Sequence, residues 1–411
     1  MELIELLKDN TTITCVYLQN SYIGDVGALS LAEALKENAT ITSVTLTANA
    51  IGDEGVSALA EMLKVNDTLE IVKLGVNSIG AQGAIALAEA LKVNTAVSSV
   101  YLQSNSIGPE GAIALAEALK VNTVITTLYL QNSSIGAEGA IALGEALKVN
   151  VHVAIIFLCG NSIGDDGVRA LAEALTVNNT VKRISLGNNF IGDEGACALA
   201  DALKVNTSIT IIELYTNSIG AEGTIALAEA LKVNTKVSSF NLCGNSIGDE
   251  GAIAVAEVLK INTAITSFNL GRCSIGAEGA VALAEAFIVN PKISNIQLWD
   301  NSIGTTGAKA LADVLKVNPV VTTLSLRKCS IGDAGTRALA ESLRVNRSIS
   351  RIDLSGNSIG NISAIALADV LNDNNTVTSV TLRNNSIGAE GVEALTDMVN
   401  ANGNIDLQGI D

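Results

Sequence analysis

The chain has 411 residues, of which 48% are hydrophobic and only 3% aromatic, and it carries three prolines and a formal net charge of −17 at pH 7. The apolar content is sufficient for a large continuous core, but so few rings mean that Leu, Ile, Val and Ala must fill it, which favours thin layers of similar units. The acidic balance argues against binding to nucleic acid or to an anionic membrane surface.

The chain starts with Met1-Glu2-Leu3-Ile4-Glu5, which lacks the basic start and the long apolar run of a secretory signal peptide. Charged residues or asparagines interrupt every apolar run before it reaches the roughly 18 residues of a membrane span. The six cysteines show no Cys-x-x-Cys pair and no clustering. We therefore expect a reduced, cytoplasmic chain that does not interact with membranes.

An Ile-Gly dipeptide recurs from Ile23 to Ile387, always at the interval that separates Ile23 from Ile51, without insertion or deletion. A fixed interval of this length indicates a repeat architecture. No linker, low-complexity tract or change in composition divides the 14 copies. We therefore predict a single domain over residues 1–411, built from about 14 full repeats and partial units at both ends.

The copy around Ile107 represents the others. Its alternating stretch 100–103 predicts one short strand, Gly108 permits a tight backbone path, and Pro109 and Glu110 suit the first turn of a helix. In the following segment, 112–120, the apolar residues fall at positions i, i+3, i+4 and i+7, which form one face of a helix. These residues are Ala112, Leu115, Ala116 and Leu119.

An asparagine follows each predicted helix, at fifteen positions from Asn10 to Asn402. We expect these asparagines to end their helices in the left-handed conformation, which Asn tolerates better than other residues with a side chain. The alternative is a row of ligand-binding amides.

The single strand and single helix of one copy cannot bury a core alone, but stacked copies can. Helices are about 10 Å wide, whereas neighbouring strands are about 4.8 Å apart, so the stack must curve with its strands inside. We predict an α/β solenoid in the form of a horseshoe, with a parallel sheet on the concave face and helices on the convex face.

The spacing Leu-x-x-Leu-x-Leu-x-x-Asn/Cys occurs here as Val97-x-x-Val100-x-Leu102-x-x-Asn105 and as Ile349-x-x-Ile352-x-Leu354-x-x-Asn357. This pattern resembles the leucine-rich repeat, and its 28-residue length with a full helix resembles the ribonuclease-inhibitor-like class of that family. The class includes the repeat domains of NOD-like receptors and the Ran GTPase-activating protein. Because it hosts many partners, the resemblance implies the fold far more specifically than the function.

The resemblance also implies that the final Asn or Cys of the motif is buried and satisfies backbone groups of the loops. This ladder position is Asn in ten copies, and the other four copies have Ser21, Ser133, Cys273 and Cys329. Cys273 and Cys329 are two repeats apart, roughly 10 Å by strand spacing, which is too far for a disulfide. One copy departs from the pattern, with Asn361-Ile362-Ser363 in place of the usual second glycine. We expect an irregular convex loop there, with a second contact site as the alternative.

Residues capable of catalysis do not form a recognisable site. The single histidine, His152, lies in a turn where the repeat spacing brings it no partner for proton transfer. The Ile-Gly-x-x-Gly segments are not followed by the Gly-Lys-Ser/Thr of a phosphate loop. Adjacent acidic pairs such as Asp165-Asp166 fall in the first turn of a helix, where the helix dipole is a sufficient reason for them. We therefore expect no enzyme activity, no cofactor and no metal.

Function is expected where the copies differ, which is at the strand positions that point to the concave side. Six of the chain's eleven aromatic residues lie there, and exposed rings on a rigid face are typical binding anchors. Seven basic residues lie there against three acidic ones, and they concentrate toward the C-terminal copies. The predicted binding residues are Tyr17, Tyr101, Tyr129, Phe157, Arg183, Tyr215, Arg272, Trp299, Arg327, Lys328, Arg351 and Arg383. Neutral drift of exposed residues is the alternative interpretation.

The leading hypothesis is a non-catalytic scaffold that binds a protein with an acidic patch on its concave face. A ligand-sensing region of a NOD-like receptor is a second hypothesis, although no nucleotide-binding module lies within these residues. GTPase activation of the Ran-directed type is a third, although no N-terminal unit carries a distinctive exposed arginine on a loop. The net charge argues against a nucleic-acid ligand.

Overall fold

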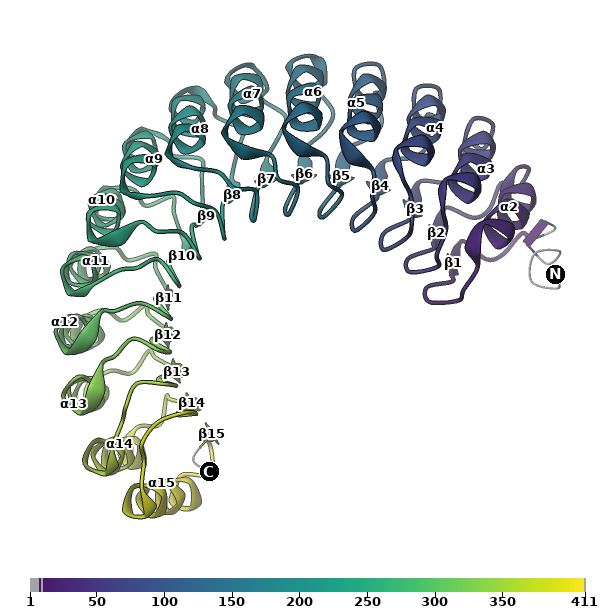
Figure 1. Cartoon of the computed structure of the whole chain (residues 1–411). Coiled ribbons are helices and arrows are strands. Elements are labelled where there is room, and N and C mark those ends of the chain that lie inside the picture. The colour runs from purple at the N-terminus through teal and green to yellow at the C-terminus, as the bar shows by residue number, and fades with distance from the viewer. Residues whose placement is uncertain (1–6, 9, 410–411) are drawn as a thin grey trace. The chain divides into compact units, whose positions relative to one another are not determined.

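The computed structural model describes residues 7–8 and 10–409 of the chain (Figure 1). Its residues fall into two compact units, 1–212 and 213–411. Within each unit a short strand and a helix alternate along the chain, and the helices all lie on the same side of the strands. The repeat predicted from the sequence is thus the repeat of the structure.

The first unit contains seven strands and seven helices within its described residues, and β8 (Ile211–Glu213) lies where the two units meet in sequence. The strands are β1 (Cys15–Tyr17), β2 (Ser43–Thr45), β3 (Ile71–Lys73), β4 (Ser99–Tyr101), β5 (Thr127–Tyr129), β6 (Ile155–Phe157) and β7 (Arg183–Ser185). The helices are α2 (Gly24–Leu35), α3 (Asp53–Leu63), α4 (Ala81–Leu91), α5 (Gly108–Leu119), α6 (Gly136–Val149), α7 (Gly164–Val177) and α8 (Asp193–Val205).

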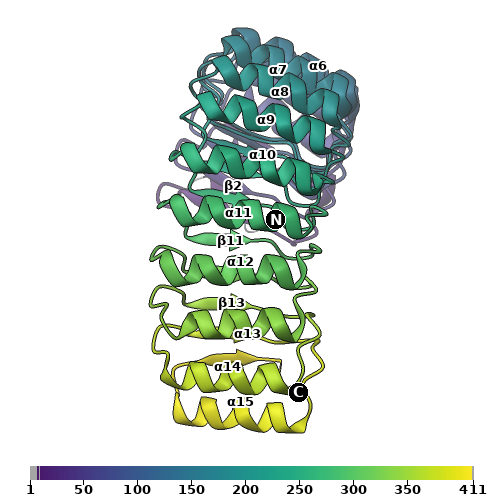
Figure 2. The ribbon, with the colours of Figure 1, turned by 90° about the vertical axis from the view of Figure 1, so that its left-hand side faces the viewer.

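The second unit continues the same alternation, and Figure 2 shows its helices side by side. Its strands are β9 (Ser239–Asn241), β10 (Ser267–Asn269), β11 (Asn295–Gln297), β12 (Thr323–Ser325), β13 (Arg351–Asp353), β14 (Ser379–Thr381) and β15 (Asp406–Gln408). Its helices are α9 (Ala221–Val233), α10 (Gly248–Ile261), α11 (Ala277–Val289), α12 (Gly304–Val317), α13 (Gly332–Leu343), α14 (Asn361–Asp373) and α15 (Ala389–Ala401).

The strands belong to two sheets, β1 to β10 and β11 to β15; the paired strands are parallel, and a residue pairs with the residue one repeat later. Val100 pairs with Leu128 in the first unit, and Leu324 pairs with Ile352 in the second. The last pair differs, because Val380 pairs with Leu407, one position short of a full repeat. Equivalent residues of successive copies therefore lie side by side, as the constant interval predicts.

The core lies between the strands and the helices and consists mainly of Leu, Ile, Val and Ala. The four predicted apolar residues of α5 are all buried, as is Ala118. A glycine in the first turn of every helix from α2 to α15 except α14, which has Ser363 there, allows neighbouring helices to approach closely. A Cβ at Gly111 would lie 2.5 Å from Cγ2 of Ile107 and 2.8 Å from Cβ of Ala84 on the preceding helix. Such distances leave no room for a side chain.

The asparagines that follow the helices correct one prediction. Asn150 has φ −76° and ψ 124°, and Asn178 has φ −81° and ψ 121°, so their backbones are extended and not left-handed. Their side chains instead join successive copies: Asn150 Nδ2 donates to the carbonyls of Leu119 (2.7 Å) and Asn122 (3.2 Å). Its Oδ1 accepts from the backbone N–H groups of His152 and Val153, both at 2.9 Å. The buried side-chain amides of Asn150 and Asn178 each donate two hydrogen bonds and accept two, which supports the structural interpretation of this row.

An acidic residue in the first turn of several helices caps the next helix along the chain. Oδ1 of Asp165 in α7 accepts from the backbone N–H groups of Gly192 (2.7 Å) and Gly195 (3.0 Å) at the start of α8. Asp25, Asp53 and Asp249 bond to the following copy in the same way. Because each cap comes from the preceding helix, it also joins the two helices.

The presence of this carboxylate decides the backbone conformation of the Ile-Gly glycine in the next copy. Gly192, which follows the copy of Asp165, has φ −100°. Gly164, which follows a copy with Ala137 at that position, has φ +64°. The same division holds at Gly52 and Gly80, preceded by aspartates, and at Gly108 and Gly136, preceded by Ala81 and Pro109. Glycine is suited to both conformations.

The irregular copy at residues 361–363 compensates for its substitutions. The Ser363 hydroxyl donates to Oδ1 of Asp333, the carboxylate that also accepts from the Gly360 N–H group at 2.8 Å. Asn361 takes the place of the capping aspartate, and its Oδ1 accepts from the N–H groups of Gly388 (2.7 Å) and Gly391 (3.2 Å). The pKa of Asp333 is lowered, mainly by the bond from Ser363. The predicted irregularity is therefore a change in which side chains form the hydrogen bonds between successive helices, while the connection between these helices is kept.

Candidate binding face

The surface formed by the strands, here called the strand face, is built from alternate residues of each strand and the loop that follows it. In β4, Val100 and the following Leu102 are buried, whereas Ser99, Tyr101 and Gln103 are only partly buried. This alternation is that of a strand with one face in the core. The twelve predicted binding residues all lie on the strand face or in these loops.

In the first unit, three aromatic rings from adjacent strands form a stack. The ring centroids of Tyr101 and Tyr129 are 4.2 Å apart with an angle of 11° between the planes, and those of Tyr129 and Phe157 are 4.7 Å apart with an angle of 12°. Residues at one register position lie side by side in a parallel sheet, so the repeat itself aligns the rings. We call these three residues the ring stack.

A cation closes each end of the ring stack. Lys73 Nζ lies 5.2 Å from the centroid of Tyr101, and the Arg183 guanidinium lies 4.8 Å from the centroid of Phe157. Both distances are within the range of cation–π attraction. Because neighbouring groups cover the ring faces, only the ring edges and the two tyrosine hydroxyls are available to a partner. The pKa of Tyr101 is raised, first by burial and then by the charge of Tyr129.

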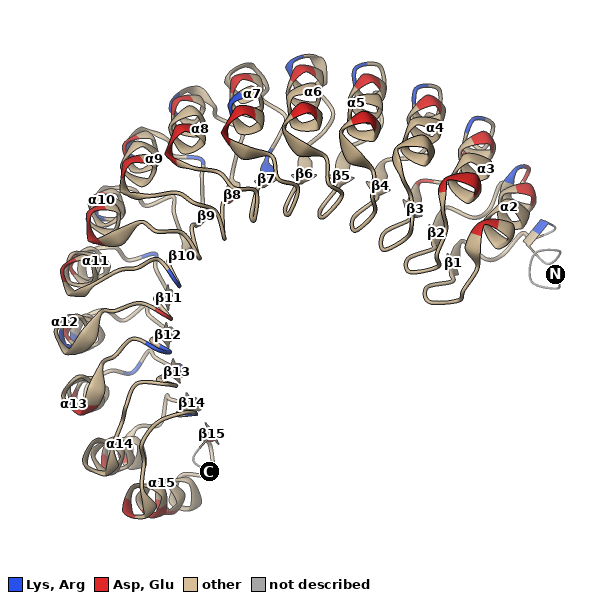
Figure 3. Cartoon of the chain, in the orientation of Figure 1, with Lys and Arg blue, Asp and Glu red and all other residues tan. Residues whose placement is uncertain are grey.

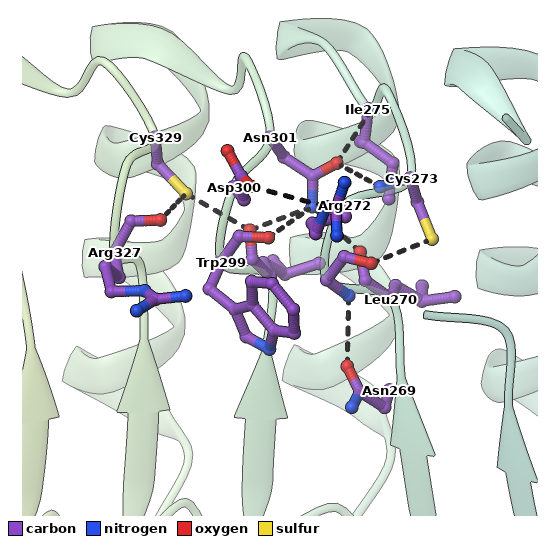
Figure 4. A network of polar contacts seen from close by, with 12 residues as sticks. Asn269, Leu270, Arg272, Cys273, Ile275, Trp299, Asp300, Asn301, Arg327 and Cys329 are labelled. Carbon is purple, nitrogen blue, oxygen red and sulfur yellow. Dashed lines mark hydrogen bonds and ion pairs between the residues drawn. The ribbon is translucent and has the colours of Figure 1, made fainter. Parts of the chain in front are cut away.

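In the second unit, Trp299 and Arg327 from neighbouring copies form a similar contact (Figure 4). The guanidinium of Arg327 lies 5.3 Å from the centroid of the Trp299 ring. The indole lies across Gly271, where an added Cβ would come within 2.3 Å of the ring. Glycine at this position therefore lets the large ring lie flat along the sheet, with one face toward the arginine.

Beside this contact, charged side chains stand on residues with a left-handed backbone. The residue before each ladder position has positive φ, and in successive copies it is Arg272 (52°), Asp300 (57°) and Lys328 (54°). Other copies have Gly, Asn, Ala48, Val76, Ser104 or Thr216 there. Arg272 Nε lies 3.5 Å from Asp300 Oδ2 (Figure 4). Since this position accepts side chains of many kinds, folding alone does not require the charges at these three residues.

The remaining predicted residues lie on the same face but outside these two clusters. Tyr17 on β1 is 69% exposed, and hydrogen bonding to Cys15 raises its pKa. Tyr215 follows β8 and is partly buried. Arg351 is at the start of β13, and Arg383 follows β14, where its Nη2 lies 3.3 Å from Gln408 Oε1. The structure thus divides the predicted set into three parts. These are the ring stack with Arg183, the group of Trp299, Arg327, Arg272 and Lys328, and the separate residues Tyr17, Tyr215, Arg351 and Arg383.

The sequence interpretation left Lys73 and Gly271 out of the binding set. The constant register of the repeat is sufficient to place Lys73 beside Tyr101 and Gly271 beside Trp299. The sequence interpretation includes Lys73 among the seven basic residues of the concave side, but does not predict its contact with the ring of Tyr101. Glycine was interpreted only as a turn residue, without its role beneath a neighbouring ring.

Charges on the helices differ in arrangement from those on the strand face. Figure 3 shows Asp and Glu concentrated on the helices. Their cations pair with carboxylates three residues earlier, for example Lys120 with Glu117 at 2.5 Å and Lys232 with Glu229 at 2.5 Å. These exposed i,i+3 pairs are worth only a few tenths of a kcal/mol each. The helix surface is nevertheless acidic, because the helices carry more Asp and Glu than Lys and Arg.

Among the described residues, no group of three or more His, Cys, Asp or Glu side chains could hold a metal ion. In the same part of the chain, no helix is both long and apolar enough to cross a membrane. The backbone N–H of His152 donates to Asn150 Oδ1. Asp165 serves as a helix cap, and Asp166 pairs with Arg169 at 2.7 Å. Each of these residues has a local structural role.

Comparison with solved structures identifies other solenoid proteins. An internalin from Listeria monocytogenes matches with a TM-score of 0.57 and 15% sequence identity, covering 96% of this chain and 96% of that one. The actin-binding site 2 of leiomodin-1 matches with a TM-score of 0.33 and 26% identity, covering 36% of this chain and 87% of that one. No curated protein matches the chain by sequence.

The pattern described as the leucine-rich repeat matches ten segments, which together make up more than half of the chain. They are residues 9–32, 37–60, 93–116, 121–144, 177–200, 233–256, 262–284, 317–340, 345–368 and 373–395. The alternation of strands and helices and the buried ladder residues agree with this assignment. The chain belongs to the leucine-rich repeat family.

Proposed function

We propose that this protein is a non-catalytic scaffold that binds a protein partner on its strand face. The observation that carries the proposal is the ring stack with its two cations. Its five side chains come from five successive copies and are held in place by one another at a surface, outside the core. Side chains ordered before binding lose little entropy when a partner arrives. Aromatic and arginine residues are also those that most often dominate binding energies.

The family and the composition support two further parts of this proposal. Copies of this length that each contain a full helix are typical of the ribonuclease-inhibitor-like class, to which we assign the chain. All six cysteines are free thiols, and those at Cys273 and Cys329 are buried. Persistent free thiols suit a reducing compartment, so we assign the protein to the cytoplasm.

Affinity capture from a cell lysate tests the proposal. The intact chain is compared with the double variant Tyr129→Ala, Phe157→Ala, which removes two rings of the stack. The matched control is Glu117→Ala, Lys120→Ala, which removes an exposed ion pair on α5 of the same unit. Circular dichroism and a urea titration confirm that all three chains are folded.

We expect at least one protein to be retained equally by the intact chain and the control but to be depleted about 30-fold or more with the ring variant, since a hot-spot residue contributes about 2 kcal/mol or more. The same set of proteins bound to all three chains would refute binding at the ring stack. Loss with the control alone would place the binding site on the helices.

A further inference from the structure

We infer that the strand face of the second unit binds an extended, carboxylate-rich peptide segment of the partner, through four residues that we call the basic group: Arg327, Lys328, Arg351 and Arg383. This inference rests on the proposed function, because it assumes that the strand face is a binding surface. It adds the chemistry of the partner segment and the residues that recognise it.

The strand register sets the spacing of two members of the basic group. Ser325 pairs with Asp353, and Asp353 pairs with Thr381. Arg327 and Arg383 each follow their strand by two residues, so they occupy the same level two strands apart, roughly 10 Å. A peptide in the polyproline II form of an extended chain has three residues per turn and rises about 3.1 Å per residue, so side chains at i and i+3 point the same way about 9 Å apart. Carboxylates at these two positions therefore match the two arginines.

Small residues lie between these arginines. Ser355 occupies the equivalent position of the middle copy, is buried, and donates its hydroxyl to Asp353 Oδ1 at 2.6 Å. Gly356 follows with φ +67°, and a Cβ there would come within 3.0 Å of Cγ of Lys328. The Lys328 stem therefore lies across Gly356, toward the space between the two arginines. Ser355 and Gly356 thus form a shallow part of the surface, with the cations of Arg327, Lys328 and Arg383 around it. A peptide main chain has room to pass over these two small residues.

Trp299 restrains one member of the basic group. The centroid of its ring lies 5.3 Å from the guanidinium of Arg327, and Figure 4 shows the two side chains just beyond the ends of adjacent strands. The guanidinium is planar in itself, and contact with a ring restricts its orientation, which suits bidentate binding of a carboxylate. The backbone at Lys328 is held in the left-handed conformation with φ 54°.

The basic group also differs from Lys260 and Arg344, two cations on the helix side of the same unit, in lacking acidic partners. Lys260 pairs with Glu257 at 2.9 Å and Glu285 at 3.2 Å, and Arg344 pairs with Glu341 at 2.9 Å and Asp369 at 2.6 Å. Within residues 7–8 and 10–409, the members of the basic group form no salt bridge. The neighbouring Asp353 accepts a hydrogen bond from the Ser355 hydroxyl, which supplies no positive charge, and Asp300 lies beside Arg272. Four cations thus face one carboxylate that has no cationic partner, so the local charge is positive. This positive charge is therefore available to an anion.

A short acidic peptide fits this surface better than a nucleic acid does. The field of four cations is local, since the Debye length is about 8 Å at physiological salt. A long polyanion would extend beyond it and meet a chain whose net charge is −17. A protein segment with a few carboxylates is short enough to contact only the basic group.

The test uses the intact chain and an octaglutamate peptide, and it exploits the fact that Trp299 is the only tryptophan. Trp299 contacts Arg327, so its fluorescence reports on the site, and titration calorimetry measures the same binding without an optical signal. The test variant is Arg327→Glu, Lys328→Glu. The matched control is Lys232→Glu, Lys260→Glu, which changes the net charge equally on two helices of the same unit. The milder Arg327→Gln, Lys328→Gln variant serves if the first does not fold.

We expect saturable binding whose affinity falls about tenfold or more in the test variant, stays within about threefold in the control, and weakens as salt rises. Absence of binding by both methods would overturn the inference, as would equal loss in test and control. Tighter binding of a single-stranded oligonucleotide of equal charge would also overturn it, in favour of a nucleic-acid ligand. If the peptide does not bind but partner capture still requires the ring stack, only the inferred chemistry fails. If capture is insensitive to the strand face, the proposed function itself fails.

Discussion

Buried amides and buried thiols occupy the same ladder position after different strands, but they satisfy different numbers of backbone groups. Asn161 Nδ2 donates to the carbonyls of Leu130 (2.7 Å) and Leu158 (2.9 Å), and its Oδ1 accepts from the N–H groups of Ser133 (2.9 Å) and Ile135 (3.4 Å). Cys329 Sγ reaches the carbonyls of Leu298 (3.1 Å) and Arg327 (3.6 Å). The asparagine thus joins two copies as both donor and acceptor.

Replacing Asn161 with Ala is expected to lower the free energy of unfolding by about 2–4 kcal/mol, because it leaves several buried backbone groups without partners. Ser133→Ala, in the preceding copy, removes a hydroxyl that donates to the Leu102 carbonyl at 3.1 Å and is expected to cost about 1 kcal/mol. Urea denaturation of both variants measures the difference. Equal losses would mean that the amide contributes no more than a hydroxyl.

The two ladder thiols predict a dependence of stability on alkaline pH. Burial raises the pKa of Cys273 and of Cys329 from the ordinary value of 9.0 to about 12. Between pH 9 and pH 12 the unfolded chain releases these protons and the folded chain retains them, so the unfolded state binds fewer protons and stability falls as pH rises. The stability is therefore fully present below pH 9.

Urea midpoints at pH 8 and pH 10 test this for the intact chain and for the variant Cys273→Ala, Cys329→Ala. The variant is expected to lose less stability over this interval than the intact chain, because two of the titrating groups are absent. An identical loss in both proteins would show that other groups determine the alkaline limit.

At the scale of a helix, two adjacent aspartates of α7 are expected to contribute very differently to the free energy of unfolding. Asp165 caps the start of α8, whereas Asp166 is exposed and pairs with Arg169 on its own helix. Asp165→Ala is expected to cost about 1–2 kcal/mol, the usual value of a lost helix cap, whereas Asp166→Ala is expected to cost under about 0.5 kcal/mol.

Thermal and urea denaturation of the two single variants provide the comparison, and hydrogen exchange at the N–H groups of Gly192 and Gly195 locates the effect. Faster exchange at these amides in Asp165→Ala, but not in Asp166→Ala, is the expected result. The reverse order of stability would mean that the cap between helices contributes less than a surface ion pair.

The elements were predictable to different degrees, for physical reasons. The helix expected at 112–120 is part of α5, because i, i+3, i+4, i+7 periodicity reflects the buried face directly. The strand expected at 100–103 is β4, Ser99–Tyr101, since strand ends depend on the neighbouring copy and not on local pattern. The helix-ending asparagines were assigned the wrong conformation because propensity describes one residue, whereas their bonds reach a carbonyl in the preceding copy.

The candidate site was predictable as a face but not as clusters. Alternation in each strand identifies the exposed positions of ten predicted residues, whereas Arg272 and Lys328 lie in the loops that follow the strands. That Tyr101 stacks on Tyr129, or that Trp299 holds Arg327, depends on side-chain direction, which composition does not contain. Whether these clusters bind a partner stays a prediction.

At the scale of the whole chain, charge is the property that spans all copies. The net charge is −17, and the ion pairs on the helices are exposed. Like charges repel throughout the folded chain, whereas each exposed pair adds little. Both effects are screened by salt, so the sign of the salt response shows which is larger.

Raising sodium chloride from about 20 to about 500 mM is therefore expected to shift the urea midpoint upward, because screening relieves more repulsion than it removes attraction. The variant Lys148→Gln, Lys260→Gln, which removes two cations that each contact two carboxylates, is expected to gain more from salt than the intact chain. A downward shift would assign the ion-pair network a larger share of the stability.

The two conformations of the Ile-Gly glycine bear on how an array like this one gains and loses copies. Gly164 and Gly192 differ in backbone conformation only according to what the preceding copy offers. If residues 164–191 were excised, Gly192 would follow Ala137 and would need the left-handed conformation that Gly164 now has. Glycine makes that change without a steric penalty, whereas alanine would resist it. Glycine at this joint therefore leaves copies free to be duplicated, deleted or reordered during evolution, with no matching change required in their neighbours.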